Sequence, residues 1–137
     1  MQDHLRISCS RQNLQQVRDF VRGFLLAGRG NELVVNQVVL AVDEVVANFI
    51  IHSNGEDASR FLDLALALTN HHLEIEIEDQ SDTLFLPQGP TPTPDLREYI
   101  RQGRKGGMGM ALVARIMDQV NFFERNSHTV CHLSKVL

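Results

Sequence analysis

The segment that most constrains the fold covers residues 32–53, which is apolar almost all the way around a helix and therefore predicts a core helix. One stripe of polar side chains interrupts it. The stripe consists of Gln37, Glu44, Asn48 and His52, at successive offsets of seven, four and four residues. These offsets place all four side chains on one helical face. The sequence thus predicts a core helix with a polar stripe, and Asn31 can cap its N-terminus.

Hydrophobic periodicity predicts the other elements. In chain order we expect a strand through Leu5, Ile7 and Cys9 that ends at Ser10, a helix over about 11–27, a β-hairpin over 61–68 and 73–77 with its turn at 70–72, a helix that opens at Met110, and strands over about 120–124 and 129–136. All four prolines fall within 87–94, which predicts an irregular loop over 80–93, followed by a short helix over 94–103. No repeat or second domain is evident, so residues 1–137 are expected to form one domain.

Composition narrows the class of protein. The chain has 13 basic and 17 acidic residues, so 13 − 17 gives a net charge of -4, and 43% of its residues are hydrophobic. This profile is typical of one soluble globular domain. No unbroken apolar run exceeds five residues and no signal peptide is evident, so we expect a cytoplasmic protein without a membrane partner. The scattered basic residues argue against a nucleic-acid partner, and Cys9 and Cys131 are expected to be reduced.

Glu44 and Asn48 lie one turn apart on the predicted core helix. A carboxylate there could act as a general base, and oxygen ligands of this kind suit Mg²⁺. The alternative is a pair of polar residues that satisfy each other at the edge of an element.

Asp79 has the strand parity of Leu73, Ile75 and Ile77, whereas the glutamates of this strand take the opposite, solvent-facing parity. Its carboxylate is therefore expected to point toward the core and to need hydrogen-bond donors. The amino group of adenine, with a bridging water, would supply them. A backbone or serine partner is the alternative.

Gly106, Gly107 and Gly109 precede a predicted helix and follow Arg104 and Lys105. Glycine backbone can close on phosphate oxygens, and a helix N-terminus favours an anion. The segment fits neither a Walker A motif nor a dinucleotide-binding fingerprint, and a plain loop before a helix is the alternative. A site around one nucleotide is favoured by the order of these features along the chain. A helical acid and amide come first, then an aspartate at a strand end, and then a glycine turn.

The stretch 42–52 resembles the N box of the histidine-kinase-like (GHKL, Bergerat-fold) ATPases, and 107–112 resembles their second glycine box. Within that superfamily the whole chain is most similar to the anti-sigma factor serine kinases. The resemblance implies that Glu44 is the catalytic base, Asn48 the Mg²⁺ ligand and Asp79 the adenine contact, with Gly107 and Gly109 at the phosphates. The other residues expected to contact the nucleotide are Ser81, Arg104, Lys105, Gly106 and Met108.

The elements and the resemblance together predict an α/β two-layer sandwich, with helices on one face of a mixed, largely antiparallel sheet. The implied function is an ATP- and Mg²⁺-dependent protein serine kinase that phosphorylates a small anti-sigma factor antagonist and sequesters a sigma factor in a partner-switching module. Segment 80–106 is expected to be a lid that orders over the phosphates. Whether the chain forms a homodimer is left open.

Ser81 departs from the family pattern, because it stands where the D-x-G motif has glycine. Serine adds a Cβ atom and disfavours a positive φ. The alternative function is therefore a catalytically weak or inactive, nucleotide-regulated protein-binding module. A detached ATPase domain of a histidine kinase is a weaker alternative, because the chain shows no phosphoacceptor helix.

Overall fold

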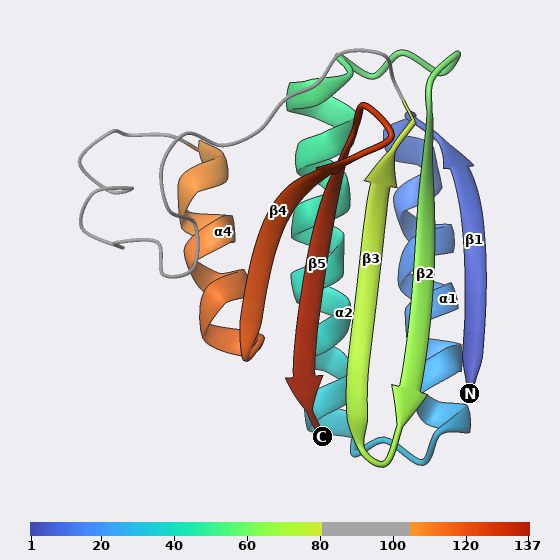
Figure 1. Cartoon of the computed structure of the whole chain (residues 1–137), viewed down its shortest axis with the longest axis vertical. Coiled ribbons are helices and arrows are strands. Elements are labelled where there is room, and N and C mark those ends of the chain that lie inside the picture. The colour runs from blue at the N-terminus through green and yellow to red at the C-terminus, as the bar shows by residue number, and fades with distance from the viewer. Residues whose placement is uncertain (81–104) are drawn as a thin grey trace.

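A five-stranded sheet with helices over one of its faces makes up the computed structural model, which describes residues 1–80 and 105–137 (Figure 1). The strands are β1 Gln2–Ser8, β2 Phe61–Thr69, β3 His72–Asp79, β4 Gln119–Arg125 and β5 His128–Val136. Their order across the sheet is β1-β2-β3-β5-β4. All four pairings in the described part of the chain are antiparallel, which confirms the predicted α/β sandwich without showing a parallel pair.

Two tight turns join neighbouring strands. Asn70 and His71 connect β2 to β3, Asn126 and Ser127 connect β4 to β5, and all four residues have positive φ. Two-residue turns of this kind match the right-handed twist of the strands they join. The hairpin is thus confirmed, but its turn is one residue shorter than predicted because His72 already pairs with Thr69.

The first strand differs from its predicted bounds. It begins at Gln2 and ends at Ser8, although the backbone N–H of Cys9 still donates to Arg60 O at 2.8 Å, one step beyond the last paired residues, Ser8 and Phe61. The Cys9 side chain is nevertheless buried, as its parity predicted. Cys9 and Cys131 are both buried and free.

Helix α1 Leu14–Ala27 follows a short 3-10 turn, η1 Arg11–Asn13, so the predicted helix over 11–27 is confirmed with a tighter first turn. Its C-terminus at Gly28 packs closely on the sheet. A Cβ atom at Gly28 would lie 2.7 Å from Leu68 Cδ2 of β2. A side chain at this position would therefore require the Leu68 side chain or the end of the helix to shift.

Helix α2 Glu32–Asn48 is the predicted core helix, and Asn31 caps it by accepting from the Leu33 N–H at 2.9 Å. It packs against α1 and α4 and continues as a π-helical turn, η2 Phe49–Ser53. By length and composition alone, Glu32–Ser53 could cross a membrane. Half of its most apolar window is buried inside the protein, as in the core helix of a folded domain.

Helix α4 Lys105–Ile116 begins earlier than predicted. The glycine segment was expected to be a turn before a helix that opens at Met110, but it forms the first turn of α4. Glycine costs about 1 kcal/mol relative to alanine inside a helix, so it weakens this turn without forbidding it. The predicted loop, the short helix over 94–103 and most of the predicted lid lie outside the described residues.

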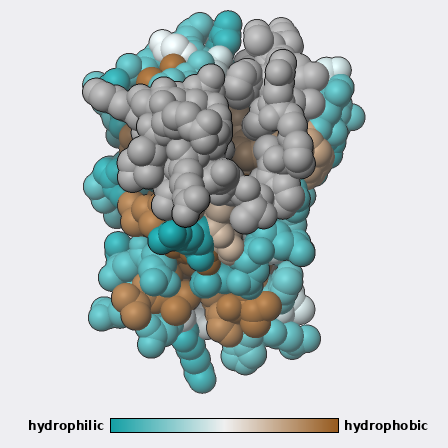
Figure 2. Space-filling model, turned by 90° about the vertical axis from the view of Figure 1, so that its left-hand side faces the viewer, coloured by the Kyte–Doolittle hydropathy of each residue, from teal (hydrophilic) through white to brown (hydrophobic). Residues whose placement is uncertain are grey.

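The surface on the side of α4 and β4 mixes hydrophilic and hydrophobic groups (Figure 2). Leu33 and Leu40 of α2 and Leu112 of α4 are among the exposed large apolar side chains. The core lies between the helices and the sheet, where the inward-facing leucines and isoleucines of β2 and β3 are buried.

Candidate functional site

The carboxylate of Glu44 lies against the backbone of α4. A Cβ atom built on Gly109 would stand 2.7 Å from Glu44 Cδ and closer still to its Oε2 atom. Only a glycine at position 109 leaves room for this carboxylate in its present place. The fold thus brings together two predicted site residues that are 65 positions apart in the sequence.

Neighbouring carboxylates of α2 face different helices. Asp43 pairs with Arg18 of α1, with Oδ1 and Nη1 2.8 Å apart. Glu44 is half-buried on the side of α4 instead. In the part of the chain that the structure describes, the side chains of Glu44 and Asn48 form no ion pair and no hydrogen bond. Within the described residues the two side chains thus do not satisfy each other, which argues against a mutually satisfied pair.

Asn48 is the last residue of α2, directly before the π-helical turn η2. A π-helical turn widens the helix and is common at functional sites. Here it begins directly after the half-buried Asn48 side chain. The structure therefore ends the regular helix at the residue for which the sequence predicted a ligand role.

Asp79 is buried at the end of β3, with 1% of its surface exposed, so its predicted inward orientation is confirmed. Asn54 donates from Nδ2 to Asp79 Oδ2 at 3.2 Å. Sequence reasoning missed Asn54, which is itself only 5% exposed. Its only local signal was the pair Asn54-Gly55, which is typical of a surface turn.

The thiol of Cys9 lies near Asp79. Burial, and to a smaller extent the negative charge of Asp79, raise the pKa of Cys9 to about 11. Because a thiol with this pKa is protonated at neutral pH, Cys9 is not a nucleophile here. It occupies a buried position near the carboxylate.

Six of the predicted nucleotide contacts are only partly placed or lie outside the described residues. Ser81 and Arg104 are outside them. Lys105, Gly106, Gly107 and Met108 are placed by their backbone in the first turn of α4. The first backbone N–H groups of a helix have no partner within it, and the helix dipole favours an anion there. The predicted phosphate-binding role of this segment is thus compatible with its helical form and stays a prediction.

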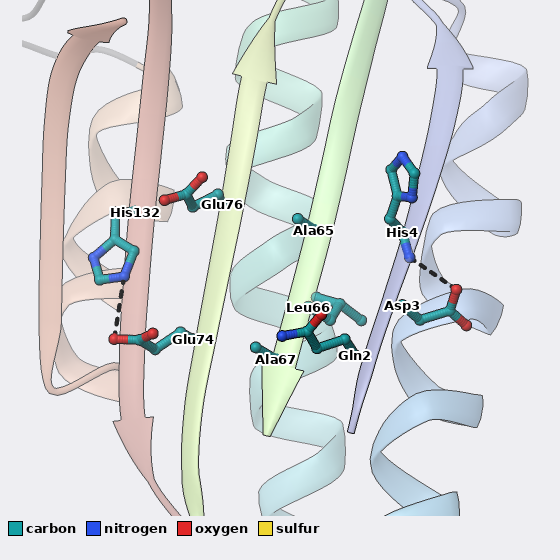
Figure 3. Close-up of a pocket in the computed structure, with 9 residues that line it drawn as sticks. All are labelled: Gln2, Asp3, His4, Ala65, Leu66, Ala67, Glu74, Glu76 and His132. Atoms are coloured by element: carbon teal, nitrogen blue, oxygen red, sulfur yellow. Dashed lines mark hydrogen bonds and ion pairs between the residues drawn. The ribbon is translucent and has the colours of Figure 1, made fainter. Parts of the chain in front are cut away.

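A cavity of about 610 Å³ opens on the opposite, solvent-facing side of the sheet (Figure 3). It is a shallow trough over Ala65 and Ala67, with His132 and Glu74 on one side and His4 on the other. The His132 Nε2 and Glu74 Oε1 atoms are 3.7 Å apart. None of the predicted site residues lines it. Because chemistry depends on convergent polar groups more than on volume, we place the candidate site between α2, α4 and the end of β3.

Comparisons with known proteins point to the same superfamily. Residues 7–135 match the family model of the histidine kinase-like ATPase domain. A curated relative, the serine-protein kinase RsbW of Oceanobacillus iheyensis, is 25% identical over 88 residues, which cover 63% of this chain. The matched region spans 56% of that relative, or about half of its length.

Two solved structures share the fold. The structure of the RsbU and RsbW domains of Rv1364c from Mycobacterium tuberculosis matches with a TM-score of 0.68 and 15% identity, over 98% of this chain and 32% of that one. The SiaB–SiaC complex from Pseudomonas aeruginosa matches with a TM-score of 0.61 and 12% identity, over 98% of this chain and 89% of that one. Because the family model extends over nearly all of the sheet and the helices that frame the site, the chain belongs to the histidine kinase-like ATPase domain family.

Proposed function

We propose that this protein binds ATP with Mg²⁺ between α2, α4 and the end of β3, and transfers the γ-phosphoryl group to a serine of a small antagonist protein. The single observation that carries the proposal is the contact between the Glu44 carboxylate and the Gly109 backbone. It sets a carboxylate beside the helix N-terminal segment that would hold phosphates. The similarity to a serine-protein kinase supports this reaction over simple hydrolysis.

The buried end of β3 would hold the base of the nucleotide. Asp79 is a buried acceptor that an exocyclic amino group could reach, and Asn54 fixes one of its oxygens. The first turn of α4 would hold the phosphates with backbone N–H groups. The Ser81 departure bears on the affinity for the base, because a Cβ atom stands where the family has none.

The oxygen atoms near the phosphate end fit a hard cation. Asn48 offers an amide oxygen and Glu44 a carboxylate, and Mg²⁺ prefers oxygen ligands. Bound there, Mg²⁺ would supply positive charge against the phosphate oxygens. We assign its protein contact to Asn48, because Glu44 is needed as the base.

Glu44 would act on the acceptor hydroxyl. As the serine Oγ atom bonds to the γ-phosphorus, the bond from phosphorus to the β–γ bridging oxygen breaks and ADP leaves. Glu44 takes the proton of the serine hydroxyl, so charge and atoms balance. The N–H groups of α4 stabilise the charge on the transferred group.

In the cell we propose that this activity belongs to a cytoplasmic partner-switching module, in which the chain also sequesters a sigma factor and is released by the antagonist. The antagonist and the sigma factor are the two partners. The competing function is a nucleotide-regulated binding module without transfer. Ser81 favours that alternative, because it departs from the D-x-G pattern.

A transfer assay tests the proposal. The chain is incubated with γ-labelled ATP, Mg²⁺ and a panel of small candidate domains that carry an exposed serine. Glu44→Gln should bind ATP almost as well as wild type, yet transfer phosphate about 10² to 10⁴ times more slowly, which is the usual worth of a positioned base.

The neighbouring carboxylate supplies a matched control. Asp43→Asn removes a charge from the same helix but from the side that faces Arg18 of α1, so transfer should be retained. If wild type binds nucleotide and a partner but labels none of the panel, the kinase proposal fails. The regulated binding module then stands.

A further inference from the structure

The side chain of Asn54 is a buried amide between the end of the core helix and the end of β3. In the described part of the chain it is one of a few buried polar residues, and Asp79 is another. Burying an amide costs free energy unless its donors and acceptor find partners. The partners that Asn54 has found therefore indicate why it is there.

The Nδ2 atom of Asn54 donates two hydrogen bonds. It donates to Phe49 O, at the start of η2, at 2.8 Å, and to Asp79 Oδ2 at 3.2 Å. Its Oδ1 atom accepts from Arg60 at 3.4 Å, a longer and weaker contact. Because an amide nitrogen carries two hydrogens, one side chain connects the helix end with the strand end.

The loop that carries Asn54 is itself fixed. Gly55 and Glu56 follow with φ of 57° and 58°, which gives the chain a sharp bend. Arg11 of η1 holds this bend through two contacts with Glu56, Nε to Oε1 at 2.7 Å and Nη2 to Oε2 at 2.9 Å. The Asn54 amide is thus presented to Asp79 from an anchored loop.

We infer that Asn54 is a positioning residue, which orients the Asp79 carboxylate toward the amino group of adenine and ties it to the helix that carries Glu44 and Asn48. This inference rests on the proposed function. A carboxylate rotates readily about its last bond, so a donor fixed on Oδ2 sets the plane in which the carboxylate meets the base. The same amide holds the helix end, so a shift of Asp79 is transmitted toward Asn48.

Base selectivity measures this role. Calorimetry compares Mg²⁺–ATP with Mg²⁺–ITP, in which a carbonyl oxygen replaces the amino group that Asp79 would bind. Wild type should prefer ATP. Asn54→Asp keeps the shape of the side chain but loses both donors, and should lower the ATP-to-ITP affinity ratio about tenfold, with most of the loss on ATP.

A second variant pair keeps the inference testable if Asn54→Asp folds poorly. In the double variant Asn54→Asp with Asp79→Asn, an amide again faces a carboxylate with the roles exchanged. The double variant should lose less unfolding free energy than the two single variants lose together, because residues in one hydrogen-bonded pair are coupled. Its ATP-to-ITP ratio should lie above that of Asn54→Asp alone.

Asn13 provides the matched control. Its Nδ2 atom also donates to a carbonyl five residues earlier, Ser8 O at 2.9 Å, but the contacts of Asn13 do not include Asp79. Asn13→Leu should lower the melting temperature and leave the ATP-to-ITP ratio unchanged.

The outcomes separate the two proposals. If wild type binds neither nucleotide, the proposed function fails and this inference with it. Suppose that wild type prefers ATP, but Asn54→Asp lowers the affinities for ATP and ITP equally or changes neither of them. Asn54 then has only a structural role, and the inference alone is wrong. Wild type that binds both nucleotides equally well would likewise overturn it.

Discussion

At the scale of single residues, replacing Gly109 should affect stability and activity in opposite directions, because Gly109 lies against the Glu44 carboxylate. Alanine at 109 would place a methyl group where the Glu44 carboxylate now lies. The carboxylate is the free end of a flexible side chain, so it can move away without disrupting the core. Alanine also favours the helix over glycine by about 0.5 to 1 kcal/mol.

We therefore expect Gly109→Ala to fold at least as stably as wild type and to lose phosphoryl transfer by about 10²-fold or more, because the base is displaced. Thermal unfolding and the transfer assay measure the two effects. Gly23→Ala is the control, since a Cβ atom there meets nothing within 4 Å on α1. Equal activity of the two variants would contradict the assigned position of Glu44.

Substitution of Asn48 should affect nucleotide binding and turnover differently from substitution of a catalytic base. Asn48→Ala should weaken nucleotide binding in the presence of Mg²⁺ and slow turnover together, because a metal contact is removed instead of a proton acceptor. Binding in EDTA should change little. Asn36→Ala, on the exposed side of α2 where the side chain bonds to Arg22, should alter neither quantity. An equal effect of Asn48→Ala with and without Mg²⁺ would exclude the metal role.

At the scale of elements, a ladder of charges crosses the solvent-facing side of the sheet behind Asp79. Asp63 of β2 and Glu78 of β3 lie directly opposite each other in register, a like-charge pair that would repel. The Gln80 amide bridges them, with Nε2 2.7 Å from Asp63 and 2.6 Å from Glu78. Arg6 neutralises Asp63 and Arg125 neutralises Glu78. Gln80 thus fixes the chain immediately after Asp79.

Because of these charged pairs, the stability of the fold should decrease as the pH falls into the acid range. A hydrogen bond from Arg6 lowers the pKa of Asp63. Burial alone would raise the pKa of Glu78, but hydrogen bonds from Arg125, His128 and Gln80 outweigh it and lower the pKa. A depressed pKa in the folded state stabilises the fold above the ordinary carboxyl pKa values, about 3.9 and 4.3. That stabilisation is lost as the pH falls through the lower folded values.

Urea unfolding at pH 7 and pH 3 checks this dependence. Arg125→Leu should lower the free energy of unfolding at pH 7, where it leaves Glu78 and Glu76 without their counter-charge. At pH 3 the carboxyls are largely protonated, so the variant and wild type should differ much less. The effect is modest because these side chains are partly exposed to solvent. A loss of equal size at both pH values would show that Arg125 acts through packing alone.

At the scale of the whole molecule, the sequence predicted the layers of the fold and the direction of its main carboxylates. The alternation of β2 and β3 fixed which side chains enter the core, so the burial of Asp79 followed from parity. The cap at Asn31 followed from the local sequence in the same way. Such features depend on spacing within one element, which a single sequence displays.

Features that depend on contacts between distant segments were not predictable in this way. The helical first turn of α4 conflicts with the usual reading of glycines as a turn, because glycine carries no side chain whose spacing would reveal a helix. Asn54 reads as a turn residue, and only the fold places it against Asp79. The contact of Glu44 with Gly109 likewise requires the packing of α2 on α4.

A calorimetric titration of the purified chain with Mg²⁺–ATP tests the proposed nucleotide site directly. We expect saturable heat, a rise in the melting temperature that follows RT ln(1 + [L]/Kd), and binding weaker by about 1 to 3 kcal/mol, or roughly 5- to 150-fold, in Asp79→Asn. No heat and no thermal shift at millimolar nucleotide would contradict the site between α2, α4 and β3, and with it the proposed kinase.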